Sequence, residues 1–232
     1  MKLPKTFCPD KDLEDTIARL LRGEKIPTDE GFNIFAGAEV FLKKQNSDTN
    51  FLDKYVLAQN IAKDLDYGWD DLDFYAKGMI MDHMDSCYLG FYLSALTNKI
   101  IKKTQTKSLS PNNDKLWGVG AFMSQGSLYV KNSVSEYAGY RMKGGSMVIQ
   151  GFAWGHLGCE MKGGSLYLNG DCDDYTGKGM QGGLIWVFGN IGRKTGLDMA
   201  NGVIRAHGSI ADISKSCKGI LYEVTEKVWP KK

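Results

Sequence analysis

Apolar residues return at a fixed period of 19 residues along the second half of the chain. The clearest marker is methionine, which occupies five equivalent positions: Met123, Met142, Met161, Met180 and Met199. Five positions after each methionine, and again two positions later, another apolar residue follows. Residues two apart on a β-strand share a face of the sheet. The pattern therefore predicts one short strand in every repeat and a stack of equivalent coils that bury their apolar faces on one another.

Glycines mark the corners of each repeat, before and after the apolar strand positions. An α-helical repeat would instead show apolar spacings of three to four and few glycines. The repeat therefore predicts a parallel β-helix with 19-residue coils, and strands near residues 127–131, 146–150, 165–169, 184–188 and 203–207. A further apolar column is expected to close each turn, and an atypical partial coil is expected at residues 220–224. The column consists of Val134, Ala153, Cys172, Ile191 and Ile210.

The first hundred residues have a different composition, because 22 of the 28 glycines lie between Gly118 and Gly219. Apolar spacing and capping residues predict helices over residues 10–21, 29–44 and 50–66. The apolar tract 69–101 predicts two more helices, broken near residues 86–90. The polar stretch 102–114, which contains Pro111, is typical of a linker. The expected fold class is therefore α+β, with a helical domain at 1–107, a linker at 108–117 and the β-helix at 118–232.

Charge and cysteine usage narrow the function classes. The formal net charge of +2 is close to balanced, which argues against nucleic acid as a partner. The sequence contains no apolar stretch long enough for a membrane span and no signal-peptide core at its start. Five cysteines without a paired spacing indicate free thiols, so we expect a cytoplasmic protein. No cofactor-binding motif is recognised, and protein subunits or a second copy of the chain are the expected partners.

Two groups of possible metal or nucleophile residues have a simpler interpretation. His83 and Cys87 are four residues apart and would share one helical face, as metal ligands can. Leu72 and Ala76 lie on the same stripe, so packing in a helical core is the favoured interpretation. Cys159 and Cys172 are 13 residues apart with no second pair of cysteines, and Cys172 occupies an apolar column. Both are expected to be small buried thiols, and no metal site is expected.

Asp171, Asp173 and Asp174 form the densest carboxylate cluster of the repeat region. A carbohydrate-active β-helix enzyme would need two carboxylates facing one glycosidic bond. The neighbouring coils offer no second carboxylate group at these positions, so an exposed polar turn is favoured, with Asp174 facing Arg193 one coil away. The enzyme remains an alternative.

The outward-facing strand positions carry Tyr129, Val148, Tyr167, Trp186 and Arg205. A solvated face would be expected to carry lysine, glutamate and threonine, whereas aligned aromatic residues are typical of a contact surface. Tyr129, Tyr167, Trp186 and Arg205 are therefore the interface candidates. Either the helical half of the chain or another protein could cover them.

The repeat itself resembles a known family. Residues 139–151 read GYRMKGGSMVIQG, residues 158–170 read GCEMKGGSLYLNG, and residues 170–180 read GDCDDYTGKGM. This text, over about residues 118–214, is similar to the GXGXG family, which includes the C-terminal domain of the glutamate synthase large subunit and one of the subunits of formylmethanofuran dehydrogenase. The related subunit of the bacterial formyltransferase/hydrolase complex belongs there too.

The resemblance implies a right-handed β-helix that acts as a non-catalytic scaffold inside a multi-part oxidoreductase. Cofactors and catalytic groups would then lie in other domains or subunits, so no catalytic or cofactor-binding residue is implied here. A stand-alone protein-interaction module is the main alternative, and the carbohydrate-active enzyme is the second.

Overall fold

A computed structural model describes residues 32–44, 50–65, 67–78, 88–111, 115–224 and 226–230. Within these residues, four helices precede the repeats, namely α2 (Phe32–Lys44), α3 (Phe51–Asp64), α4 (Trp69–Gly78) and α5 (Leu89–Ile100). The helices expected from 50–66 and from 69–101 are confirmed, and α2 confirms the described part of 29–44. The segment expected to be helical at 10–21 lies outside the described residues, as do His83 and Cys87.

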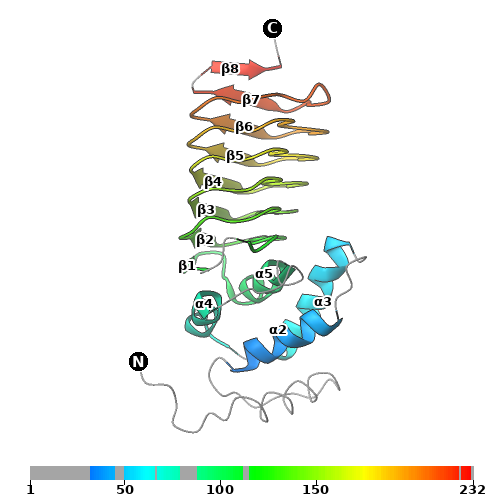
Figure 1. Cartoon of the computed structure of the whole chain (residues 1–232), viewed down its shortest axis with the longest axis vertical. Helices are drawn as coiled ribbons and strands as arrows, with labels where there is room; N and C mark the ends of the chain where they lie inside the picture. Colours follow the sequence, from blue (N-terminus) through cyan, green and yellow to red (C-terminus); the bar gives the residue numbers. More distant parts are fainter. Residues whose placement is uncertain are drawn as a thin grey trace.

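The repeats form a parallel β-solenoid, in which one strand of each coil joins a single sheet (Figure 1). The sheet runs in chain order, and its strands β1 to β7 are parallel. The expected α+β class is therefore confirmed. The strands are β1 (Thr106–Leu109), β2 (Ser127–Val130), β3 (Ser146–Gln150), β4 (Ser165–Asn169), β5 (Leu184–Val187), β6 (Val203–Ala206), β7 (Ile220–Glu223) and β8 (Glu226–Trp229).

The columns read from the sequence are the core of the solenoid. All five repeat methionines are fully buried, and strands β2 to β6 pair with a register of 19 residues, so that Leu128 lies beside Met147 and Met147 beside Leu166. The closing column forms a second, narrower line of parallel bridges from Val134 to Ile210. Methionine suits this interior because its unbranched side chain fills irregular gaps between coils.

The C-terminal end of the solenoid is closed by a hairpin. The strand expected within 220–224 is present as β7, which continues the parallel register on β6. The next strand, β8, pairs with β7 in the antiparallel direction, which the 19-residue pattern does not predict. The Trp229 side chain turns back on the coil and donates from Nε1 to the carbonyl of Cys217 (2.8 Å). Strand β8 therefore covers the last parallel edge of the sheet.

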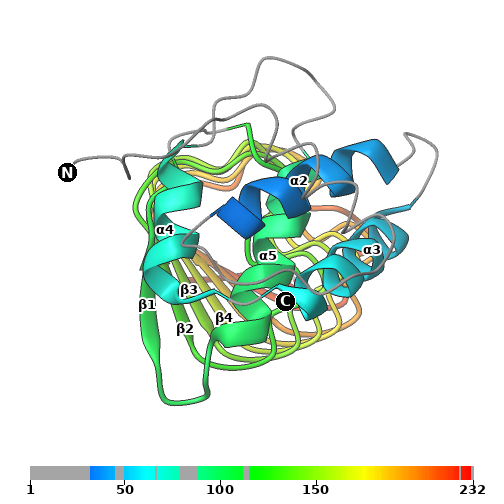
Figure 2. The same ribbon diagram turned by 90° about the horizontal axis from the view of Figure 1, so that it is seen from below.

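The helices close the other end. Figure 2, which looks along the stack from that end, shows α5 lying across the first coil, with α3 and α4 on either side of it. Ser94 Oγ donates to the carbonyl of Gly118 (2.7 Å), and Asn98 Nδ2 donates to the carbonyl of Ala121 (2.9 Å). A Cβ at Gly90 would lie only 2.1 Å from the Trp117 carbonyl oxygen, so α5 reaches this close contact only with glycine there. The helical segment thus caps the solenoid.

The stretch expected to be a linker contains a strand. Within 102–114, β1 forms the first rung of the sheet by pairing with β2. Helix α4 fixes this rung, because Trp69 Nε1 donates to the Ser108 carbonyl (3.1 Å) and the Ser110 backbone N–H donates to Asp73 (3.0 Å). The sequence does not reveal β1 because it precedes the repeat and lacks the repeat's glycines and methionine.

Candidate functional site: an aromatic face of the solenoid

The four interface candidates lie in one column on the outer face of the sheet. The strand register places Tyr129 beside Val148, followed by Tyr167, Trp186 and Arg205 on successive coils. The aromatic side chains are half-buried, whereas Arg205 is exposed. The rings of Tyr167 and Trp186 are in contact, with centroids 6.3 Å apart. The alternation read from the sequence therefore places these residues correctly, and their role as an interface stays a prediction.

The two columns that flank this row change character along the stack. On β2, β3 and β4 the outward residues beside the row are serines and polar residues, such as Ser127, Ser146 and Ser165. From β5 onward they are apolar, apart from His207. We call the resulting surface the C-terminal patch; it consists of Leu184, Trp186, Phe188, Val203, Arg205, Ile220, Tyr222 and Val224.

The C-terminal patch exposes large apolar side chains that a folded chain usually buries. Phe188 is 45% exposed, Ile220 37% and Val224 57%. Trp186 and Phe188 stack with their rings nearly parallel, at 5.2 Å between centroids. Alternation along single strands reveals only the central row; the change from serine to leucine, valine and isoleucine becomes visible when the flanking columns are compared across coils.

Arg205 lies between two rings of the C-terminal patch. Its guanidinium carbon is 5.6 Å from the Trp186 ring centroid and 4.7 Å from that of Tyr222. Such contacts attract a cation to the negative faces of aromatic rings. The guanidinium is therefore held at a defined place on a rigid sheet rather than at the end of a freely rotating side chain.

The described helices do not lie over this face. Figure 1 shows α2 to α5 beyond the β1 end of the stack, whereas the C-terminal patch lies on β5, β6 and β7 near the opposite end. In the described structure, these helices therefore do not fold back over Trp186. Within the described residues, the helices instead contact the first coils.

Asp171, Asp173 and Asp174 form what we call the aspartate corner, which provides hydrogen-bond acceptors for the backbone of the neighbouring coil. Asp171 Oδ1 accepts from the backbone N–H of Asn190 (2.6 Å), and Asp174 Oδ1 accepts from that of Arg193 (2.7 Å). Asp171 and Asp173 are exposed, as expected, while Asp174 is half-buried. The expected partnership of Asp174 with Arg193 is present, but through the backbone rather than the guanidinium. The hydrogen bonds also run between coils instead of within one turn, because glycines at 189 and 192 leave room for the carboxylates.

A second column of aromatic residues, not recognised from the sequence, runs along one corner of the solenoid. His156 stacks between Tyr137 and Tyr175, at centroid distances of 4.5 and 4.8 Å, and Lys194 Nζ donates to the Tyr175 hydroxyl (2.7 Å). Burial, with the nearby charge of Lys178, lowers the pKa of His156, although Glu136 Oε2 lies 3.5 Å from its Nδ1. These rings cover one another's faces, so the column is a packed ladder rather than an open platform.

The buried thiols are structural. Cys159 and Cys172 are free and buried, as expected, and burial raises the pKa of each thiol to about 12. A thiol that stays protonated is a poor nucleophile and metal ligand. Among the described residues, no group of three or more histidine, cysteine, aspartate or glutamate side chains gathers as a metal site would require. In the same part of the chain, no helix has the length and apolarity needed to cross a membrane.

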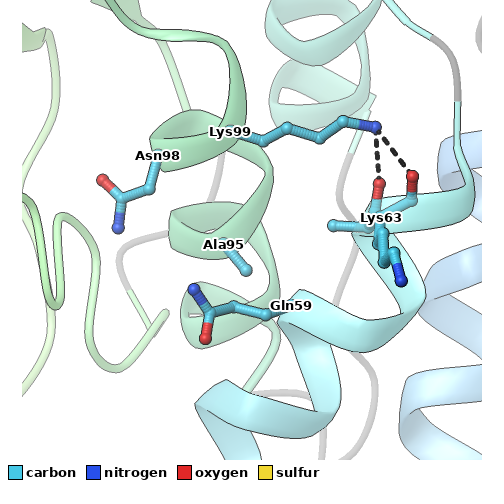
Figure 3. Close-up of a pocket in the computed structure, with 6 residues that line it drawn as sticks. Gln59, Lys63, Ala95, Asn98 and Lys99 are labelled. Atoms are coloured by element: carbon cyan, nitrogen blue, oxygen red, sulfur yellow. Dashed lines mark hydrogen bonds between the residues drawn. The ribbon is translucent and has the colours of Figure 1, made fainter.

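The cavity between α3 and α5 is also interpreted as a structural feature of the helix packing. It measures about 300 Å³ and is lined by Gln59, Ala62, Lys63, Ala95, Asn98 and Lys99. Figure 3 shows Lys99 reaching from α5 to the end of α3, where its Nζ donates to the carbonyls of Ala62 (2.8 Å) and Lys63 (3.3 Å). A cation at the carbonyl end of a helix satisfies unpaired acceptors and complements the helix dipole. The Lys99 ammonium thus holds α5 to the end of α3.

Comparison with known proteins agrees with the geometry. The family described as GXGXG motif matches residues 74–193, slightly more than half of the chain. The match begins within α4 rather than at Gly118, and it ends at Arg193 rather than near residue 214. No curated protein and no solved structure matches the chain. With its 19-residue coils, its glycine corners and this match, the chain belongs to the GXGXG motif family.

Proposed function

We propose that this protein is a non-catalytic structural subunit or module, which docks another protein on the C-terminal patch. The associated chemistry would be that of an oxidoreductase assembly of the kind that the GXGXG resemblance implies, glutamate-synthase-like or formylmethanofuran-dehydrogenase-like. The observation that carries the proposal is the exposed apolar and aromatic surface on β5, β6 and β7. Such a surface on a single chain typically marks a protein contact.

The energetics favour a covered patch. Burying a large apolar side chain is worth about 2 kcal/mol; Trp186 and Phe188 stack at the end of β5, and Ile220 lies two strands away, on β7 of the same sheet. The side chains stand on strands whose hydrogen bonds are satisfied on both sides, so little conformational freedom is lost when a partner binds. Aromatic residues surrounded by aliphatic ones are the typical centre of a binding surface.

The aspartate corner supports a structural role over the carbohydrate-active alternative. Two of its three carboxylates already accept hydrogen bonds from the next coil, at 2.6 and 2.7 Å. A catalytic acid and a catalytic base would need to face one substrate bond instead. Replacing Asp171, Asp173 and Asp174 together by asparagine should therefore leave any hydrolase or lyase activity of the purified protein unchanged; a loss would favour the enzyme.

Affinity purification from the native cell, followed by identification of the co-purified subunits, tests the proposal. Trp186→Ala should leave the melting temperature nearly unchanged and weaken association at least about 10-fold, because a buried interface tryptophan often contributes about 2 kcal/mol or more. Trp154→Ala is the matched control, since Trp154 is an exposed tryptophan (53%) outside the patch. The Trp154→Ala variant should associate with the partner as the wild type does.

The identity of the captured proteins separates the assembly from the alternative. Redox subunits would support an oxidoreductase assembly, whereas unrelated proteins would favour a stand-alone interaction module. If Trp186→Ala alters neither association nor stability, the patch is ordinary surface and the docking proposal is wrong.

A further inference from the structure

We infer that the C-terminal patch recognises a protein segment in which an aspartate or glutamate stands among apolar residues, and that Arg205 is the residue that selects this carboxylate. The inference rests on the proposed docking function and names the chemistry of the partner. It follows from the charge, the neighbours and the exposure of Arg205.

Arg205 carries a permanent charge for which the described side chains supply no carboxylate. The ion pairs found among them involve Asp73, Glu136 and Glu160, none of which lies on β5, β6 or β7. On the face, Arg205 lies over the rings of Trp186 and Tyr222, which stabilise the cation but do not neutralise it. A guanidinium offers parallel N–H donors that match a carboxylate in geometry, and a ring-bound guanidinium loses less freedom on pairing.

The surroundings of Arg205 specify the rest of the segment. Val203 and Ile220 are outward neighbours in adjacent strands, and Phe188 and Val224 follow the strand ends nearby. A charged pair formed among such side chains would be shielded from water, which strengthens the attraction once the pair has formed. The ligand should therefore be apolar on both sides of its carboxylate.

A second copy of the chain fits less well. In a two-fold contact the same patch would face itself. Arg205 would then approach another Arg205, and the described side chains of the patch include no acidic group to separate the two charges. Like charges brought together in an apolar contact are unfavourable.

Single-stranded nucleic acid also fits less well. It binds to basic grooves with several cations and to exposed ring faces. The patch has one arginine, and one face of Trp186 is already covered by Phe188, whose ring is nearly parallel to it. The aliphatic residues Val203, Ile220 and Val224 favour protein side chains over bases.

Selection of a phage-displayed library of random peptides on the full-length protein tests the inference. Recovered peptides are synthesised, and their affinities are measured for the wild type and for Trp186→Ala, Arg205→Gln and Arg205→Lys. Circular dichroism and the melting temperature verify that each variant folds. Because Arg205 is exposed, both of its substitutions should leave the fold intact.

The expected peptides contain aspartate or glutamate flanked by apolar residues and require Trp186. Their affinity should fall at least about 10-fold in Arg205→Gln and less in Arg205→Lys, which keeps the charge but loses the planar fork. Raising the salt concentration from about 50 to about 500 mM should weaken binding to the wild type more than binding to Arg205→Gln. Replacing the peptide carboxylate by its amide should matter for the wild type and not for Arg205→Gln.

Other outcomes would overturn the inference. Peptides that need Trp186 but bind Arg205→Gln equally well would refute the carboxylate selection and leave the docking function standing. Absence of any Trp186-dependent peptide would contradict both. Sedimentation of the wild type as a dimer that Arg205→Gln strengthens, or Arg205-dependent binding of a fluorescent single-stranded oligonucleotide, would show that the patch serves a second copy or a nucleic acid instead.

Discussion

At the scale of the residue, the coil imposes a left-handed backbone at the same corner in every repeat, and glycine is only one of the solutions used. Phe122, Arg141, Glu160 and Asp198 have φ between 51° and 58°, and Gly179 occupies the same column with φ 63°. A non-glycine residue in this region costs about 1–2 kcal/mol. The solenoid accepts this cost several times, since the packing of neighbouring coils determines the backbone there.

Two glycines with nearly equal φ angles allow the stability cost of backbone strain to be distinguished from the cost of a steric clash. Gly158 has φ 64°, and a Cβ there would lie 2.5 Å from Cδ1 of Ile185 in the next coil. Gly179 has φ 63°, and the nearest atom to a Cβ is Cγ of Glu160 at 3.3 Å. Gly179→Ala should therefore cost about 1 kcal/mol from strain alone, and Gly158→Ala about 2–4 kcal/mol because it also overpacks the core. Urea unfolding measures both; equal losses would mean that the clash is relieved elsewhere.

The buried thiol of Cys172 predicts an alkaline loss of stability. Its pKa rises from 9.0 to about 12 through burial, so between these values the unfolded chain releases a proton that the folded chain keeps. Stability then falls as pH rises through this window, by about 2 kcal/mol between about pH 7 and pH 10.5. Cys172→Val should remove this part of the loss and cost little at neutral pH, since Val134 and Ile191 occupy the same column. Chemical unfolding of the wild type and of Cys172→Val at the two pH values tests this prediction. Equal losses of stability in the two proteins would contradict the assignment to Cys172.

At the scale of the element, the strands that the sequence predicts are those that lie within the 19-residue repeats. The strands at 146–150 and 165–169 agree with the structure at both ends, because glycine corners and inward methionines fix the register. The pattern does not predict strands β1 and β8, since β1 precedes the first full repeat and is fixed by α4, whereas β8 follows the last one and is fixed by β7. For the same reason, only part of the candidate site could be predicted from the sequence. The central aromatic row could be read from alternation, whereas the partnership of Arg205 with Tyr222 depends on a strand outside the regular repeat.

Strand β8 should act as the protective end of the sheet. Without it, β7 would present unpaired backbone groups beside the apolar residues Ile220 and Val224, which favours association between chains. A chain shortened to end at residue 224 should therefore form concentration-dependent oligomers in analytical ultracentrifugation. Trp229→Ala is the control, because it keeps the strand and removes only the packing and the hydrogen bond to the Cys217 carbonyl. That variant should lose stability and remain unassociated; a shortened chain that behaves like the wild type would show that β8 is dispensable.

At the scale of the whole molecule, the helical segment and the solenoid share one aromatic cluster. Phe51, at the start of α3, stacks on Phe91 of α5 with centroids 5.2 Å apart and also contacts Tyr137, at 4.5 Å, in the solenoid. Asn50 fixes the position of this ring, because its side chain accepts the Asp53 backbone N–H and so caps α3. The helices thus supply the first coil with the apolar neighbour that a preceding coil supplies to every other one. A terminal cap of this kind is what a stacked repeat needs.

Removal of the Phe51 ring should therefore destabilise strands as well as helices. Phe51→Ala is expected to cost about 2–3 kcal/mol, less than a fully buried phenylalanine, because the side chain is only half-buried. Hydrogen exchange measured by mass spectrometry should show faster exchange in β2 and β3 together with α3 and α5, since the first coil loses its cap when the helices open. Leu52→Ala is the matched control: Leu52 is the next residue, is 41% exposed, and should change neither region. Faster exchange confined to α3 and α5 would mean that the helical segment unfolds on its own. The predicted division into a helical domain at 1–107 and a β-helix at 118–232, joined by 108–117, would then describe two independent units.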